Sequence, residues 1–162
     1  MLILDAVLCI ILVMLDQAAK SAVVTHLKGK DDIILIENVL QFHYLENRGA
    51  AFSMLQNATF VFVIAAILMF AAICYVFFKL PDGKKYIPWH IFLTLIAAGG
   101  IGNLIDRIRL TYVIDFIYFS LINFPVFNVA DICVTLGVAF ICIFILFVWK
   151  DEDMRFLSRN GK

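Results

Sequence analysis

Three long runs of uncharged residues constrain this chain more than any other feature. They extend over Ala58–Phe78, Tyr86–Ile105 and Ile132–Trp149, and none contains lysine, arginine, aspartate or glutamate. A helix needs about 20 mainly apolar residues to cross the hydrocarbon core of a bilayer. The whole composition agrees, because 64% of the residues are hydrophobic and only 16% are charged. The sequence therefore predicts an integral membrane protein with at least three spanning helices.

The N-terminal segment is a fourth candidate span. Leu2–Leu15 is apolar apart from Asp5, and Asp16 and Lys20 follow shortly after it. A cleaved signal peptide is the competing interpretation, but it would require a basic N-terminal region and a recognisable cleavage site. Neither stands out in this sequence. We therefore interpret the segment as a retained span that ends near Leu27.

Four spans predict one membrane domain over residues 1–162, with both termini on the same side. The expected spans cover about 2–27, 58–79, 86–107 and 127–149, and the segments opposite the termini cover about 28–57 and 108–126. The side with the termini holds seven lysines and arginines, against six on the other side, so the positive-inside rule favours cytoplasmic termini only slightly. The net charge of zero gives no indication of nucleic-acid binding, and no obligate protein partner is inferred.

The two segments opposite the termini differ in character. In the first, β-branched and aromatic residues surround Glu37-Asn38, a pattern that is typical of a small β-hairpin. The second, Leu110–Phe127, is rich in aromatic residues, which favour the headgroup region of a bilayer. The predicted fold class is therefore an all-α integral membrane protein with four transmembrane helices, a small β-hairpin and an aromatic interfacial segment.

Polar residues gather at one end of these predicted spans. Because successive spans alternate in direction, the polar ends of the first, third and fourth spans meet at the face opposite the termini. The residues concerned are Asp16, Lys20, Asn47, Arg48, Asn103, Asp106, Arg107, Asp115, Asn128 and Asp131. Many of those on the spans are three or four positions apart, which places them on a common helix face. Gly99, Gly100 and Gly102 would let the third span approach a neighbour closely.

Most of these residues also have an ordinary structural explanation. Asn128 and Asp131 suit a helix N-cap and an acidic first turn, and charged neighbours such as Asp106-Arg107 suit an interfacial ion pair. Asp16 and Lys20 suit a compensated pair where a helix leaves the lipid. Asp115 is harder to explain in this way, because it stands among apolar neighbours, where a carboxylate is costly without partners.

Two carboxyl groups held close together can carry out peptide hydrolysis. They cannot both ionise easily, so the pair shares one proton near neutral pH. The ionised member then takes a proton from water while the protonated member polarises the scissile carbonyl. The three histidines and four cysteines show no metal-ligand spacing, so no metal or other cofactor is expected. Ser53 and Ser120 lack a histidine partner that would make either a nucleophile.

Two other classes of function remain open at this point. Charged residues within membrane helices also mark ion and proton transport paths, although transporters usually place them near the midplane and show internal repeats. A non-catalytic membrane subunit is the other alternative. It would leave the placement of Asp115 and Asp131 unexplained.

Five sequence blocks, in order, resemble lipoprotein signal peptidase (signal peptidase II). The blocks are Asp16-Gln17-x-x-Lys20, Asn47-x-Gly49-Ala50-Ala51-Phe52, Gly99-Gly100-x-Gly102-Asn103-x-x-Asp106-Arg107, Val113-Ile114-Asp115-Phe116 and Phe127-Asn128-x-Ala130-Asp131. They cover most of the chain from Asp16 to Asp131. One block alone would be a weak signal, but five in order on a four-span background are specific.

The resemblance implies an aspartyl endopeptidase of the bacterial inner membrane that acts on diacylglyceryl-modified prolipoproteins. It would cut N-terminal to the lipidated cysteine, with both termini in the cytoplasm and the site at the outer face. The hairpin segment would correspond to the β-cradle of the family. The resemblance implies that Asp115 and Asp131 form the catalytic dyad. The site-lining or supporting residues would be Asp16, Lys20, Asn47, Gly49, Asn103, Asp106, Arg107, Asn128 and Ala130.

Overall fold

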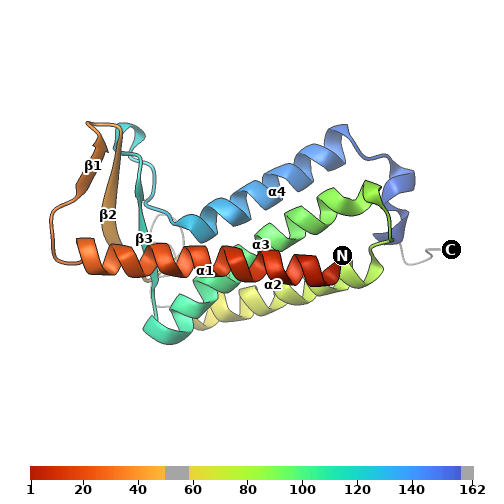
Figure 1. Ribbon diagram of the computed structural model, residues 1–162, viewed down its shortest axis with the longest axis horizontal. Coiled ribbons are helices and arrows are strands. Elements are labelled where there is room, and N and C mark those ends of the chain that lie inside the picture. Colours follow the sequence, from red (N-terminus) through yellow and green to blue (C-terminus); the bar gives the residue numbers. More distant parts are fainter. Residues whose placement is uncertain (50–58, 158–162) are drawn as a thin grey trace.

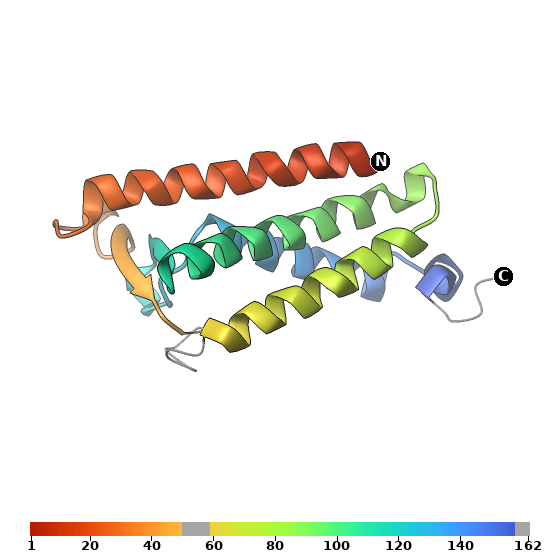
Figure 2. The same ribbon diagram turned by 90° about the horizontal axis from the view of Figure 1, so that it is seen from below.

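Four helices in the described part of the chain are long and apolar enough to cross a membrane. The computed structural model describes residues 1–49 and 59–157. The helices are α1 (Leu2–Leu27), α2 (Thr59–Lys79), α3 (Ile87–Leu110) and α4 (Val129–Phe147), and they extend along the length of the molecule (Figures 1 and 2). The predicted four-helix membrane architecture is confirmed. The block Ala50-Ala51-Phe52 and Ser53 lie outside the described residues.

Helix α3 is the centre of the bundle, because it lies against each of the other three helices. Small residues allow this close approach. A Cβ on Gly99 would collide with the carbonyl oxygen of Ala130 on α4, and one on Gly102 would lie 2.6 Å from the Asp16 carboxylate on α1. Larger side chains at these positions would push α3 away from its neighbours. The glycines therefore bring the polar residues of α1, α3 and α4 together.

The outer surfaces of the helices carry large apolar side chains. Phe60 and Phe78 on α2 and Leu146 and Phe147 on α4 are each at least 72% exposed. Apolar surface on this scale is unfavourable in water but is what a helix presents to lipid tails. The exposure pattern therefore agrees with a membrane-embedded bundle.

A small antiparallel sheet closes one end of the bundle, and the N-terminus lies at the other end (Figure 1). Strand β1 (Ile33–Ile36) turns into β2 (Leu40–Asn47) through Asn38, which has a φ of 57°. This is the predicted hairpin. A third strand, β3 (Val113–Tyr118), pairs with β2 and comes from the segment for which we expected only an aromatic interfacial position. Its β-branched residues, Val113, Ile114 and Ile117, explain why it joins the sheet.

Aromatic residues close the opposite end. The rings of Trp89 and Trp149 stack with their centres 4.4 Å apart, and Phe156 packs edge-on against Trp89. Phe156 belongs to the 3-10 segment η4 (Asp151–Leu157), which is held by an ion pair between Asp153 and Lys85. Aromatic packing and an ion pair therefore hold this end of the molecule, which is separated by the length of α3 from the polar residues near the sheet.

Candidate active site

Asp131 is held at the first turn of α4 by a reciprocal cap. The side-chain oxygen of Asn128 accepts from the backbone N–H of Asp131 at 2.9 Å, and the Asp131 carboxylate accepts from the backbone N–H of Asn128 at 3.2 Å. This is a capping box, which satisfies two backbone donors that the helix leaves unpaired. The sequence-based prediction that Asn128 and Asp131 cap the start of this helix is therefore confirmed. The cap also fixes where the Asp131 carboxylate points.

Asp115 is placed by the alternation of strand β3. Ile114 and Phe116 lie in the apolar cluster formed with Val23 and Leu27 of α1. Because successive side chains of a strand point to opposite faces, Asp115 faces away from that cluster and lines a cavity next to the sheet. Only 1% of the residue is exposed, so the carboxyl group has little contact with bulk water.

Three asparagines direct their amide groups at the two aspartates. Asn47 donates to Asp115 at 2.7 Å, Asn128 donates to Asp115 at 2.6 Å, and Asn103 donates to Asp131 at 2.8 Å. Two elements supply the dyad, β3 and α4, and the amides come from β2, α3 and the cap of α4. Each carboxyl group therefore receives hydrogen-bond donors from outside its own element.

The orientation of each asparagine follows from an obligatory donor on its other side. The ammonium group of Lys20 can only donate, so the oxygen of Asn103 must face it at 2.9 Å. In the same way, the backbone N–H groups of Asp131 and Gly49 fix the oxygens of Asn128 and Asn47. The NH₂ groups must then face the carboxyl groups. This assignment needs no arbitrary choice between the two ends of an amide.

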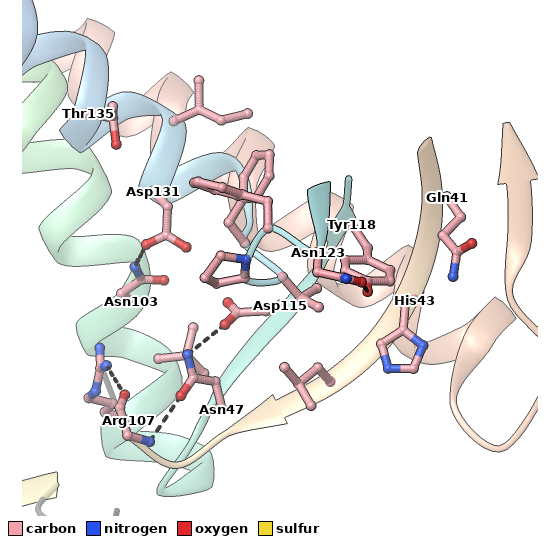
Figure 3. A pocket seen from close by; sticks show the side chains of 18 of the residues that line it. Gln41, His43, Asn47, Asn103, Arg107, Asp115, Tyr118, Asn123, Asp131 and Thr135 are labelled. Carbon is pink, nitrogen blue, oxygen red and sulfur yellow. Dashed lines mark hydrogen bonds between the residues drawn. The ribbon is translucent and has the colours of Figure 1, made fainter. Parts of the chain in front are cut away.

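The two carboxyl groups face each other across the cavity (Figure 3). The cavity has a volume of about 1090 Å³, and Asn47, Asn103 and Arg107 also line it. Burial, and then the negative charge of Asp131, raise the pKa of Asp115 to about 7, while its bonds to Asn47 and Asn128 act in the opposite direction. A carboxyl pair of this kind holds one shared proton near neutral pH.

Lys20 is a fully buried cation at the centre of the supporting network. Its ammonium group lies 2.9 Å from Asp16, 2.9 Å from Asp106 and 2.9 Å from the oxygen of Asn103. All three of its N–H donors therefore have an acceptor. The two carboxylates compensate the charge, as a buried lysine requires, and the amide oxygen accepts the third hydrogen bond. The network connects α1 to α3 and, through Asn103, to Asp131.

The remaining predicted residues occupy distinct places around this network. The backbone N–H of Ala130 donates to Asp16 at 2.9 Å, which joins α4 to α1. The carbonyl oxygen of Gly49 accepts from Arg107 at 3.4 Å, and the Arg107 guanidinium lies 4.5 Å from the centre of the Phe62 ring. Arg48 does not join the site, because it pairs with Glu46 at 3.2 Å on the surface.

Some residues of the site were not singled out from the sequence. Gln17 donates to Asp16, to Asp106 and to the carbonyl oxygen of Gly102 at 3.0–3.2 Å, so it completes the buried network. Its position beside Asp16 within the first sequence block was the available signal. Asp32, Gln41 and His43 of the hairpin line the same cavity as the dyad. No spacing in the sequence connects them to Asp115.

Comparison with known proteins identifies similar chains. The family model described as signal peptidase II matches residues 8–147. The lipoprotein signal peptidase of Clostridioides difficile is 42% identical over 138 residues, which cover 85% of this chain and 91% of the relative. That of Streptococcus agalactiae is 39% identical over 151 residues, which cover 93% and 95% of the two chains. A solved structure described as a bacterial membrane enzyme superposes with a TM-score of 0.80 at 29% identity, covering 96% of this chain and 92% of that one.

Proposed function

This chain belongs to the signal peptidase II family, and on that premise we propose that Asp115 and Asp131 are the catalytic pair with which it cleaves signal peptides from prolipoproteins. The observation that carries the assignment is the meeting of two carboxyl groups in one cavity, the buried one of Asp115 on β3 and the partly buried one of Asp131 on α4, with amide donors on both. Membership of this family does not favour the two alternative functions, a transporter or a non-catalytic membrane subunit. The chain is an aspartic endopeptidase of the membrane.

The reaction needs one proton on the pair and one water between its members. The ionised carboxylate removes a proton from the water as the oxygen attacks the scissile carbonyl carbon, and the protonated carboxyl group donates to the carbonyl oxygen. The tetrahedral intermediate then breaks at the C–N bond, and the departing nitrogen takes a proton from the pair. The products are the carboxylate of the signal peptide and a free amine on the mature protein.

The asparagines keep the carboxyl groups in position during these steps. Asn47 and Asn128 bond different oxygens of Asp115, so that carboxyl group cannot rotate without losing a bond. Asn103 and the backbone N–H of Asn128 likewise bond different oxygens of Asp131, and Lys20 in turn holds Asn103. Positioning of this kind accelerates the reaction, because the reacting groups are already oriented and need no reorganisation to reach the transition state.

We infer that the substrate is a prolipoprotein carrying a diacylglyceryl group. The cavity meets the membrane helices at Phe62 of α2 and at Ile132 and Leu136 of α4, which offer apolar surface beside the dyad. A lipid-anchored chain reaches such a site by diffusion within the membrane. We propose that the enzyme lies in the bacterial cytoplasmic membrane, with both termini in the cytoplasm and the dyad at the outer face. The slight excess of lysine and arginine on the side with the termini favours this orientation.

We expect the purified enzyme to cut a diacylglyceryl-modified prolipoprotein and to leave the same prolipoprotein without the lipid largely uncut. The two acyl chains supply binding energy that the unmodified substrate lacks, so kcat/KM should differ by at least about a hundredfold. Gel-shift assays of both substrates in the same detergent measure the ratio. Equal cleavage of the two substrates would contradict the lipid requirement while leaving the dyad assignment intact.

The pH dependence of cleavage reports the shared proton. Since the pKa of Asp115 is raised to about 7, the pair loses its proton as the pH rises through that region, and kcat/KM should fall on the alkaline side. Asn47→Ala removes a donor that stabilises ionised Asp115, so the alkaline limb should move upward by roughly 0.5–1 pH unit. A limb that stays in place or moves downward would show that Asn47 does not act on this carboxyl group.

A further inference from the structure

The hairpin contributes a polar wall to the cavity that contains the dyad. We use the term hairpin wall for Asp32, Gln41 and His43, which line that cavity together. The Asp32 carboxylate accepts from Gln41 at 2.8 Å and lies 2.9 Å from Nδ1 of His43. The side chains of Asp32 and His43 are 32% and 41% exposed, so the wall is accessible from the cavity. None of these contacts takes part in the network that holds the dyad.

The cavity has two ends of different chemistry, with the dyad between them. Towards the membrane helices it is lined by Phe62, Ile132 and Leu136, and towards the sheet the hairpin wall adds polar side chains to apolar ones such as Leu45 and Val113. Figure 3 shows Asp115 and Asp131 between Thr135 of α4 on one side and Gln41 and His43 of β2 on the other. A substrate that crosses the dyad therefore passes from an apolar surface to one that also offers a carboxylate, an amide and an imidazole.

Strand register sets the distance from the dyad to the hairpin wall. Asp115 lies opposite Leu45 of β2, and Tyr118 lies opposite Gln41. A register shift between Phe42 and Leu45 makes three residues of β3 span four of β2. Gln41 is therefore about 10–13 Å along the sheet from Asp115 at the usual rise of a strand, and His43 is about 7 Å from it. An extended substrate covers the same distances with the second to fourth residues beyond the bond that is cut.

We propose that the hairpin wall binds the first residues of the mature protein after the lipidated cysteine, with Asp32 setting the charge that these residues can carry. The inference rests on the proposed function, since it requires a signal peptide on one side of the cut and a mature chain on the other. The signal peptide is apolar and matches the helix end of the cavity. The mature chain must leave the membrane and matches the polar end.

Asp32 gives the wall a preference between basic and acidic residues. A lysine at the second to fourth mature position gains a carboxylate partner, whereas an aspartate at the same position meets a like charge. The neighbouring Asp31 provides a matched control, because it is exposed and does not line the cavity. The two residues carry the same charge one position apart, so long-range electrostatics affects both almost equally.

The test uses two lipidated prolipoproteins that differ only in having lysine or aspartate at the third mature position. We expect Asp32→Asn to lower the lysine-to-aspartate ratio of kcat/KM by about twofold to fivefold. Asp32→Lys should lower it further, and Asp31→Asn should leave it unchanged. Because both substrates are compared on the same variant, damage to the hairpin alone would reduce both values and leave the ratio unaltered.

The outcomes separate the two proposals. If the wild type cuts both substrates and the ratio is the same in Asp32→Asn, or changes equally in Asp31→Asn, the hairpin wall does not read the mature chain and the inference is wrong. If the wild-type enzyme cuts neither lipidated substrate, the proposed function is wrong and the inference falls with it. A ratio that changes only in the Asp32 variants supports the inference.

Discussion

The Asp131→Asn variant is expected to fold normally and to lose about a thousandfold in kcat/KM on a lipidated prolipoprotein. The asparagine has nearly the same shape, and its side-chain oxygen can still accept one of the two bonds that the carboxylate receives from Asn103 and from the Asn128 backbone. It cannot take a proton from water, however, and general acid–base catalysis contributes about a hundredfold to ten-thousandfold. Asp115→Asn should behave in the same way.

A carboxyl group at the other end of the molecule is the matched control. Asp153 is buried and bonded to Lys85 and to the backbone of Lys150, but it lies in η4 at the opposite end from the sheet. Asp153→Asn should therefore retain nearly all activity. Unfolding curves for the variants in detergent separate loss of catalysis from loss of fold. If folded Asp131→Asn keeps near-wild-type activity, Asp131 is not a catalytic group.

Replacing Lys20 with methionine is expected to lower the free energy of unfolding by about 3–5 kcal/mol. Methionine has a similar length, but it leaves the buried carboxylates of Asp16 and Asp106 facing each other without a cation. Removing one partner of a buried charge cluster is costly because the remaining charges stay desolvated. Asn103 also loses the donor that orients it toward Asp131, so activity should fall with stability.

Lys28→Met provides the comparison for this effect. Lys28 directly follows α1 and, like Lys20, pairs with a carboxylate, that of Glu46 at 2.9 Å. Its side chain, however, is half exposed. Water replaces that partner readily, so the melting temperature and the activity should remain close to the wild-type values. Thermal unfolding of both variants in the same detergent makes the comparison. Equal destabilisation of the two would contradict a central role for Lys20.

The sequence predicted which residues meet, because membrane topology restricts where a residue can be. Four alternating spans bring the ends of α1, α3 and α4 to the same face, and residues such as Asp16, Asn103 and Asp131 are then neighbours whatever the details of packing. The uncharged runs predicted the helices for the same reason, since a bilayer leaves few alternatives. Asn128 carried an N-cap signal as well, and the cap and the site turn out to use the same side chain.

The contacts that orient the site residues could not be predicted from the sequence. The aromatic and β-branched residues around Asp115 are compatible with an interfacial segment and with a strand, and only pairing with β2 decides between them. Gln17 makes three contacts with groups on α1 and α3 that depend on the close approach at Gly102. Asp32 and His43 join the cavity through the register of the hairpin, which local patterns do not determine.

The most direct test of the catalytic pair is kcat/KM for four proteins, the wild type, Asp115→Asn, Asp131→Asn and the double variant, on one lipidated prolipoprotein with a metal chelator present. When two residues act as a unit, the effects of substituting them on kcat/KM are strongly non-additive. The double variant should therefore be at most about tenfold slower than either single variant. Independent effects would multiply to a loss of about a millionfold. That result, or near-wild-type activity in either folded single variant, would contradict the assignment of Asp115 and Asp131 as one catalytic pair.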